Sequence, residues 1–485
     1  MTTEVGPAWP SADATQAENA KPGDGSWQHG VDPPPTSVEG FAGRASVLPG
    51  EPVVLYVHST QGPVVVKAYR AGWYGGAGAR LVWTSPQVSQ VDQPTPTYGA
   101  STRTWSASNW TPSITFLTVD WPPGDYLLRL DAASGAANVI PLTVRATTTK
   151  GAVVLVNANT TWQAYNHWGG TSLYRGSKGP DDRAYAVSLD RPLDAGYGAL
   201  NTPLNELPLV QLAEELGLSV AYVTDTDLNS IPHLLDGARA VISLVHDEYY
   251  SQAMRDALTQ ARDGQGTNLA FLGANAIYRH IRLAPTPIGP DRLEIDFKEA
   301  GIDPVTKTNP DDATSQWRNP PNPRPESVLT GVYYQCNPVR ADLVAAQSDS
   351  WLLAGTGVKA GDKLPMVVGL EYDQVTPKVP TPRPIEVLFH SPVTCVGVHQ
   401  FSDAAYYTTP SGAGVFATGT NAWICAMVEA CQFPGQNQHS ADVVTMITTT
   451  LLQAFAASPA GQAHPARDNL DALGINSSTT RDISR

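Results

Sequence analysis

The hexapeptide at residues 151–156 reads Gly-Ala-Val-Val-Leu-Val and is apolar throughout. A strand without polar positions is typical of a parallel sheet whose two faces are both covered by helices. More strand-like runs follow it and alternate with helical patterns. The strands are expected at 218–223, 240–245 and 268–272, and the helices at 207–216 and 251–262. This alternation predicts a flavodoxin/glutamine-amidotransferase-like parallel α/β domain over residues 148–457.

The chain before this domain has a different pattern. Short runs rich in branched and aromatic residues are separated by turn signals, and they show no helical period. These runs lie at 52–57, 63–69, 126–130 and 140–145. They predict an immunoglobulin-like β-sandwich over residues 38–147.

Three further segments lack such patterns. Residues 1–37 are polar and turn-rich, and we expect a flexible N-terminal arm there. Residues 280–400 are rich in proline and aspartate, which predicts a long irregular insertion over the sheet, with room for extra antiparallel strands. Residues 458–485 are polar, which predicts a disordered tail.

Composition excludes several classes of function. The formal net charge is −14 and basic residues do not cluster, which argues against nucleic acid and anionic membranes as partners. No apolar run is long enough to span a bilayer, and residues 1–25 lack a signal-peptide pattern, so we expect a cytoplasmic protein. The four cysteines form no CxxC pair, so we expect neither a zinc ribbon nor a redox motif, and we expect the thiols to be reduced.

Polar side chains follow three of the predicted strands. Tyr165 lies in the segment after 151–156, His246 and Glu248 follow 240–245, and Asn275 follows 268–272. Ligands of open α/β sheets bind outside the carboxyl ends of the strands, so these groups are expected to converge on one site.

Each of these residues also has a structural explanation. His246 and Tyr165 could be packed side chains with satisfied hydrogen bonds, and Asp247 is best explained as a carboxylate near the start of the helix at 251–262. Glu248 comes one position later, where the predicted crevice at the strand ends opens, and this position favours a role for Glu248 as a ligand. No GxSxG elbow, strand-end cysteine nucleophile or HExxH helix is present. A carboxylate pair of Glu248 with Glu371 stays open.

Several motifs resemble the large (β) subunit of N,N-dimethylformamidase and its relatives. One of them is Asn-Thr-Thr-Trp-Gln-Ala-Tyr-Asn at 159–166. The others lie at 70–80, 170–174, 187–192, 246–249, 273–275, 330–333 and 411–416. The resemblance runs in order from about residue 40 to 455. It implies one iron per chain, expected to be ferric, that is held by two tyrosines and one glutamate and hydrolyses a small amide.

The resemblance places the glutamate at Glu248 and one tyrosine at Tyr165. Tyr126 lies at about the expected separation upstream and is the predicted second tyrosine, although a Tyr after Gly-Asp also fits the tyrosine corner of a sandwich. Tyr249 and Tyr74 are the substitutes for it.

His246, Asn275 and Glu371 match positions around the metal in the family. A metal-activated water would then cleave the C–N bond of a formamide-like substrate. His246 would move the proton or orient the water, and Asn275 would donate to the oxyanion. The chain lacks the extra N-terminal region of the dimethylformamidase subunit and has Tyr250 where relatives often have Trp, which leaves the substrate open.

Two other functions fit the sequence. One is a metal-free ligand-binding or regulatory protein on the same fold, and the other is a carbohydrate hydrolase that uses carboxylates alone. By analogy with the relatives, we expect a homo-oligomer with a small-molecule substrate, and a small partner subunit is an option.

Overall fold

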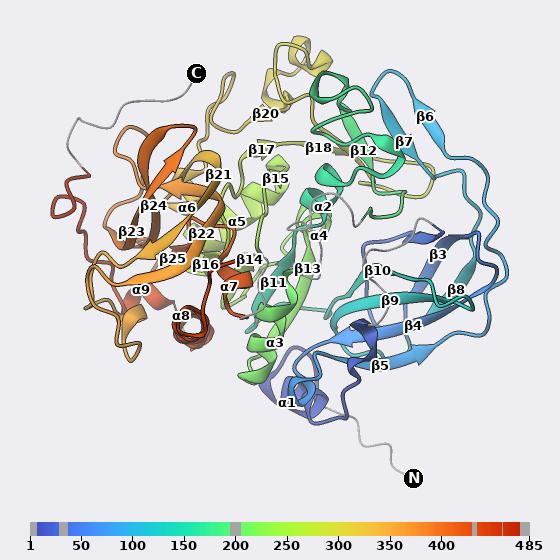
Figure 1. Cartoon of the computed structure of the whole chain (residues 1–485), viewed down its shortest axis with the longest axis horizontal. Helices are drawn as coiled ribbons and strands as arrows, with labels where there is room; N and C mark the ends of the chain where they lie inside the picture. The colour runs from blue at the N-terminus through green and yellow to red at the C-terminus, as the bar shows by residue number, and fades with distance from the viewer. Residues whose placement is uncertain (1–6, 29–36, 195–204, 429–433, 458, 476–485) are drawn as a thin grey trace.

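The computed structural model describes residues 7–28, 37–194, 205–428, 434–457 and 459–475. Figure 1 shows a strand-rich region in blue and cyan at one end of the molecule, with sheets and helices in green to red beside it. The mixed α/β class is therefore confirmed. The immunoglobulin-like and flavodoxin/glutamine-amidotransferase-like topologies stay predictions.

The strand-rich region contains two sheets that share one hydrophobic core. The smaller sheet has the order β1 (Val38–Ala42), β3 (Pro52–Ser59), β8 (Ile114–Leu117), and the larger has β2 (Ser46–Val47), β10 (Ala137–Val144), β9 (Gly124–Ala132), β4 (Val64–Ala71), β5 (Ala79–Thr84). Alternate residues of β3 are buried, as expected for a strand with one face on the core. A separate hairpin pairs β6 (Thr97–Gly99) with β7 (Thr104–Ser106).

A seven-stranded sheet forms the centre of the rest of the chain. Its order is β13 (Val220–Thr224), β11 (Val153–Asn157), β14 (Ala240–Ser243), β16 (Asn268–Phe271), β25 (Gly414–Ala417), β24 (Val398–Thr408), β23 (Ile385–Cys395). The first five strands are parallel, and β24 and β23 extend the sheet in antiparallel fashion. Every residue of the five parallel strands is buried, which explains their continuous apolar sequences.

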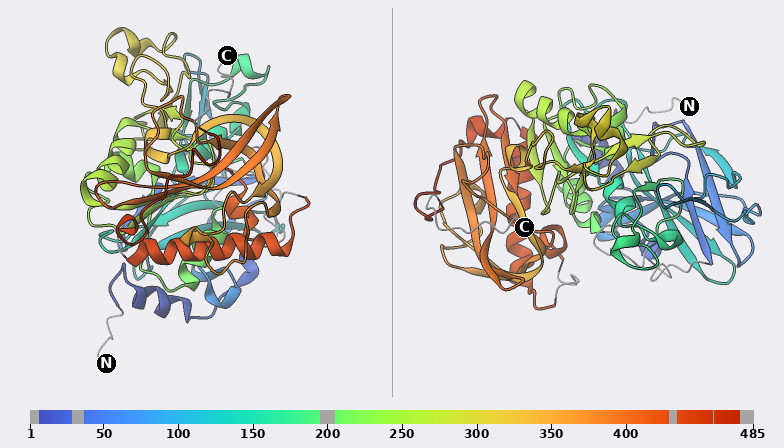
Figure 2. Two further views of the ribbon diagram at one scale, coloured as in Figure 1. Left: turned by 90° about the vertical axis from the view of Figure 1, so that its left-hand side faces the viewer. Right: turned by 90° about the horizontal axis from the view of Figure 1, so that it is seen from above.

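Helices cover both faces of this sheet. Val153 and Leu155 of β11 share a core cluster with α3 (Leu207–Glu215) and α8 (Gln438–Ala457), whereas Val154 and Val156 share another with α5 (Gln252–Gln265). Figure 2 shows α8 in red along one side of the sheet. Within the described residues, α8 is long and apolar enough to cross a membrane, but half of it is buried against the core, as in an ordinary core helix. The shorter helices are α2 (Asn159–Tyr165), α4 (Asp225–Ser230), α6 (Ser327–Thr330), α7 (Trp423–Ala426) and α9 (Ala460–Ala463).

The segment predicted as an irregular insertion, 280–400, is irregular only in its first part. That part contains β17 (Arg279–His280), β18 (Arg282–Ala284), β19 (Leu293–Ile295) and β20 (Ser315–Gln316), which pair among themselves and with β12 (Ala186–Ser188) and β15 (Tyr249–Tyr250). From residue 333 the chain forms long antiparallel strands, β21 (Tyr333–Val344) and β22 (Lys363–Gln374), before β23 and β24. Prolines within these strands and three register shifts between β21 and β22 interrupt the alternation that would have revealed them.

The predicted flexible arm and disordered tail are both wrong for the parts that the structure describes. α1 (Ala12–Asn19) packs against α3, and Trp27 is buried in the main core. Near the C-terminus, Asp468 pairs with Arg383, and Leu470 is buried. The calls for residues 1–6, 29–36, 458 and 476–485 lie outside the described residues.

The expectation of reduced cysteines is also wrong. A disulfide joins Cys336 on β21 to Cys395 on β23, across a sequence separation of 59 residues. Sequence spacing gives no signal for such a pairing, because β21 and β23 belong to different sheets and come together only in the folded chain.

A buried ion pair joins the sandwich to the α/β part. Arg70 on β4 and Glu214 on α3 form a two-pronged pair, and both side chains are fully buried. Asn19 of α1 and the Tyr222 hydroxyl also donate to the Glu214 carboxylate. Tyr74 accepts from Arg70 and donates to Glu18, so its phenol belongs to this network.

Glu214→Ala should lower the free energy of unfolding by about 3–5 kcal/mol, because it leaves the buried positive charge of Arg70 without its carboxylate partner. Urea unfolding followed by tryptophan fluorescence measures this loss. The double variant Arg70→Met with Glu214→Leu should lose clearly less, since it removes both charges together. A double variant as unstable as Glu214→Ala would contradict the role of the unpaired charge.

Candidate functional site

Three side-chain oxygens meet beyond the carboxyl ends of the central strands. The Tyr165 hydroxyl donates to Glu248 Oε2 at 2.8 Å, and the Tyr174 hydroxyl donates to the same oxygen at 2.6 Å. The two phenol rings are stacked, with their centroids 4.3 Å apart. We call Tyr165 Oη, Tyr174 Oη and Glu248 Oε2 the oxygen cluster.

Helix α2 fixes Glu248 at two points. β11 ends at Asn157 and α2 begins two residues later, so the helix starts at the edge of the sheet where ligands bind. Thr161 and Tyr165 are four residues apart and therefore lie on one face of α2. The backbone N–H of Glu248 donates to Thr161 Oγ1 at 3.0 Å, while Tyr165 binds the carboxylate.

Tyr174 reaches the cluster from a loop that turns back onto α2. The backbone N–H of Leu173 donates to the carbonyl of Ala164 at 3.0 Å, which places residue 174 beside residue 165. The resemblance includes the motif at 170–174, but the spacing of the sequence did not single out Tyr174 as a ligand. Apart from that motif, the sequence shows only a tyrosine nine positions after Tyr165, and the path of the loop is what brings the two together.

The structure also brings His246, Asn275 and Glu371 to the cluster. His246 Nε2 lies 3.6 Å from both Glu248 Oε2 and Glu371 Oε2. Glu371, on β22, accepts a hydrogen bond from the Asn337 side chain at 3.1 Å, and the Asn275 amide lies beside it. Among the described residues, Glu371 Oε2 and Asn275 Oδ1 are buried without a hydrogen-bond partner. The predicted convergence of strand-end residues is therefore observed, whereas their chemical roles stay predictions.

Two residues beside the cluster have strained backbones. Val245 and Asn275 have φ values of 46° and 59°, in the left-handed region that costs a β-branched residue most. The N–H of Asn275 donates to Asp373 Oδ1 at 2.8 Å, which helps to hold this turn. Such strain is typical of functional sites that the surrounding structure holds in place.

The two carboxyl groups have opposite protonation tendencies. Burial acts to raise the pKa of Glu248, but His246, Arg279 and Lys298 face it and the net pKa is lowered. Burial and the negative charge of Glu248 raise the pKa of Glu371 well above its usual range. Glu248 is therefore ionised and Glu371 protonated near neutral pH, the division expected of an anchoring carboxylate and a general acid.

The two phenols and the His246 imidazole beside these carboxyl groups stay neutral. Burial and the charge of Glu248 raise the pKa of Tyr165 and Tyr174 well above 10, so both phenols keep their protons. Burial lowers the pKa of His246, although Glu248 acts against it. Arg279 stays charged at every relevant pH, so it provides the permanent positive charge next to Glu248.

Neither the predicted second tyrosine, Tyr126, nor its two substitutes is part of the oxygen cluster. Tyr126 is in the sandwich core, where its hydroxyl donates to the Pro122 carbonyl at 2.7 Å and its ring stacks on Trp121. Tyr74 belongs to the Arg70 network. Tyr249 lies near the cluster, with its ring centroid 6.4 Å from those of Tyr165 and Tyr174, but it contacts them only edge-on.

Asp247 does not have the helix-start role that the sequence suggested. Its Oδ2 accepts hydrogen bonds from Ser243 and Tyr250, and it is fully buried. Ser251 caps α5 instead, by accepting from the N–H of Met254.

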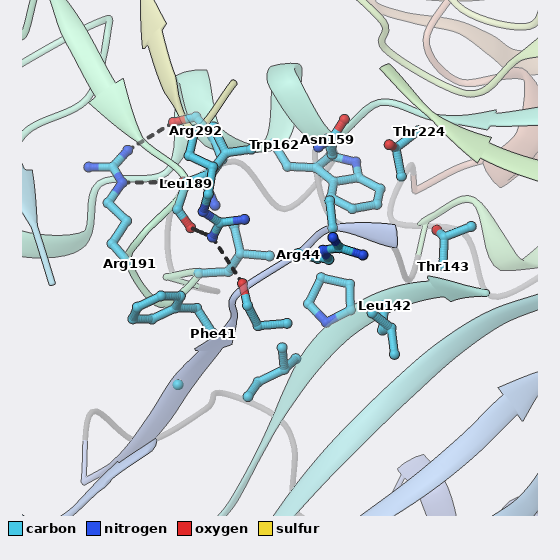
Figure 3. A pocket seen from close by; sticks show the side chains of 17 residues that line it. Phe41, Arg44, Leu142, Thr143, Asn159, Trp162, Leu189, Arg191, Thr224 and Arg292 are labelled. Atoms are coloured by element: carbon cyan, nitrogen blue, oxygen red, sulfur yellow. Dashed lines mark hydrogen bonds between the residues drawn. The ribbon is translucent and has the colours of Figure 1, made fainter. Parts of the chain in front are cut away.

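A separate hollow of about 60 Å³ lies on the other side of α2, against the sandwich (Figure 3). Asn159 and Trp162 of α2 line it, together with Phe41 and Leu142 of the sandwich. Arg191, also in its wall, donates to backbone carbonyls such as that of Gln163. None of the predicted site residues lines this hollow, so we assign it to the interface between the two regions.

Comparisons with known proteins were made against families, curated proteins and solved structures. The family model described as N,N-dimethylformamidase beta subunit-like, C-terminal, matches residues 65–437. No curated protein matches the chain. Among solved structures, a cycloisomaltooligosaccharide glucanotransferase from Paenibacillus sp., complexed with cycloisomaltoheptaose, is similar at 8% identity over 76% of this chain and 68% of that chain. Its TM-score is 0.17, which does not indicate a shared fold.

The site makes the stability of the protein depend on pH through Lys298, whose Nζ lies 3.3 Å from the ring centroid of Tyr174. Burial and the charge of Arg279 lower the pKa of Lys298 to about 7, whereas an unfolded lysine titrates near 10.4. Between these values the folded protein binds fewer protons than the unfolded chain, so the contribution of Lys298 to the unfolding free energy rises with pH. Urea unfolding of the wild type and Lys298→Met between about pH 7 and 10 should show the wild type gaining stability relative to the variant. A constant or falling difference would contradict the assignment.

Proposed function

Since this chain belongs to the N,N-dimethylformamidase beta subunit-like family, we propose that it is an iron-dependent amidohydrolase that cleaves the C–N bond of a small, formamide-like N-substituted amide. The family name supports a dimethylformamidase-like hydrolase. The observation that carries the iron assignment is the oxygen cluster, in which two phenols and one ionised carboxylate share a single meeting point.

The residues fit a ferric ion chemically. Phenolate and carboxylate oxygens are hard, anionic donors, which a ferric ion prefers to the softer ligands typical of zinc. Tyr165, Tyr174 and Glu248 would hold the metal, and the two phenols would give up the protons that they now donate to Glu248 Oε2. Among the described residues, no group of three or more His, Cys, Asp and Glu side chains could hold a metal ion. The proposed donor set lies outside that class of site, because two of its three members are tyrosines. When bound, iron would act as a Lewis acid and lower the pKa of a water molecule.

The remaining residues can move protons and orient the substrate. Protonated Glu371 is suited to donate a proton to the leaving amine, because its raised pKa keeps the proton available near neutral pH. Neutral His246 lies between Glu371 and Glu248, where it can accept a proton and pass it on. The Asn275 amide, held beside Glu371, could donate a hydrogen bond to the oxygen of the substrate carbonyl. The family name also supports assembly with a second kind of subunit or as an oligomer.

The ligand assignment predicts a loss of iron from specific variants. Glu248→Ala, Tyr165→Phe and Tyr174→Phe should each lose bound iron, and the two tyrosine variants should also lose the visible tyrosinate-to-iron absorption band. Tyr126→Phe is the matched control, because it removes a buried phenol from the same chain. Metal analysis and visible spectra of the purified proteins measure this outcome. Full iron content in Tyr174→Phe, or loss in Tyr126→Phe, would contradict the assignment.

The proton-transfer roles predict a loss of activity without a loss of iron. Glu371→Gln and His246→Ala should lower kcat on a small formamide by roughly 10²–10⁴-fold, the usual contribution of general acid–base catalysis. Release of the amine and the carboxylate measures the rate, and metal analysis of the same samples separates catalysis from binding. A Glu371→Gln variant with wild-type kcat would show that Glu371 is not the acid.

The two alternative functions give different results. A carbohydrate hydrolase that uses Glu248 and Glu371 as its carboxylate pair would keep its activity in the presence of a strong iron chelator. A metal-free binding protein would take up no iron on reconstitution and would hydrolyse no amide.

A further inference from the structure

The two carboxylate oxygens of Glu248 have different partners. Oε2 accepts both phenol hydroxyls of the oxygen cluster. Oε1 lies 3.4 Å from the Nε of Arg279. The carboxylate is thus turned so that one oxygen faces the two phenols and the other faces the guanidinium of Arg279.

Arg279 is held firmly in this position. It lies on β17, where its register partners are Tyr249 on β15 and Gln316 on β20. Its backbone N–H donates to the carbonyl of Glu248 at 2.9 Å, so Arg279 contacts both the backbone and the side chain of Glu248. Its guanidinium lies 4.9 Å from the ring centroid of Tyr278, and its side chain is only 14% exposed.

A fixed guanidinium beside Glu248 limits the carboxylate oxygens that are available to bind a metal to one. An arginine stays charged at all pH values of interest, and a buried anion without a partner is strongly destabilised. If both carboxylate oxygens turned toward the phenols, Glu248 would give up its interaction with Arg279. A donor set of three single oxygens also leaves positions open for a substrate and water, which is what a catalytic metal needs.

We propose that Arg279 is a positioning residue that holds Oε1 of Glu248 and so reserves Oε2 as the carboxylate oxygen that binds the metal. This inference rests on the proposed iron site and adds the mode in which Glu248 binds. It assigns Arg279 a role in metal binding and no direct part in the chemistry of the substrate.

The test compares Arg279→Met, Arg279→Lys and Arg318→Met with the wild type. Arg318 is the matched control, because its guanidinium lies 4.8 Å from the same Tyr278 ring but pairs with Glu326 instead of Glu248. Each apoprotein is titrated with ferric iron, and the dissociation constant and the position of the visible band are recorded. Thermal unfolding of the apoproteins shows whether each variant is folded.

Arg279→Met should weaken iron binding by roughly 10–100-fold, the usual cost of losing a residue that orients a metal ligand. Its visible band should also shift, because Glu248 no longer binds through Oε2 alone. Arg279→Lys keeps the charge and should restore most of the affinity and the band position. Arg318→Met should lose stability and keep both iron properties of the wild type.

An iron-loaded Arg279→Met with wild-type affinity and band position would overturn the inference and leave the iron site intact. If Arg279→Met does not fold, Arg279→Gln takes its place, because it also removes the charge. Weakened iron binding with a shifted band in Arg279→Gln supports the proposal, and wild-type affinity and band position overturn it. A wild type that binds no iron would instead overturn the proposed function, and the inference with it.

Discussion

A buried negative charge on Glu248 is the constraint on which the arrangement of the site depends. The carboxylate is almost completely removed from solvent, so hydrogen bonds and a nearby cation must replace its hydration. Two phenols and Arg279 supply these interactions, and α2 and β17 hold the backbone of Glu248 in place. Burial, together with this charge, raises the pKa of Glu371 and of both phenols, so these three groups keep their protons.

The fold places this charge where chemistry is possible. Parallel strands end together at one edge of the central sheet, and the segments that follow β11, β14 and β16 carry Tyr165, Glu248 and Asn275 to that edge. Strand β22, which pairs with β21 in a separate two-stranded sheet, adds Glu371. None of the three residues of the oxygen cluster comes from the sandwich, but the Arg70–Glu214 pair attaches the sandwich to α3, which packs on the central sheet.

The sequence predicts those features that depend on local patterns. Continuous apolar runs revealed the parallel strands, and the rule that ligands lie at strand ends selected Tyr165, His246, Glu248 and Asn275 before any contact was known. Features that depend on the path of the chain were missed. Tyr174 joins the cluster because a loop returns to Ala164, whereas Tyr126 has a suitable separation along the sequence but is packed in another core. Prolines and bulges hid β21 to β24, and the Cys336–Cys395 disulfide joins strands that are distant in sequence.

The central claim is that Tyr165, Tyr174 and Glu248 hold one iron ion. The most direct test is a crystal structure of the iron-reconstituted protein, with anomalous diffraction recorded on both sides of the iron absorption edge. The account predicts a single anomalous peak within bonding distance of Tyr165 Oη, Tyr174 Oη and Glu248 Oε2. A peak elsewhere, or an oxygen cluster without metal in a protein that has been exposed to excess iron, would contradict it.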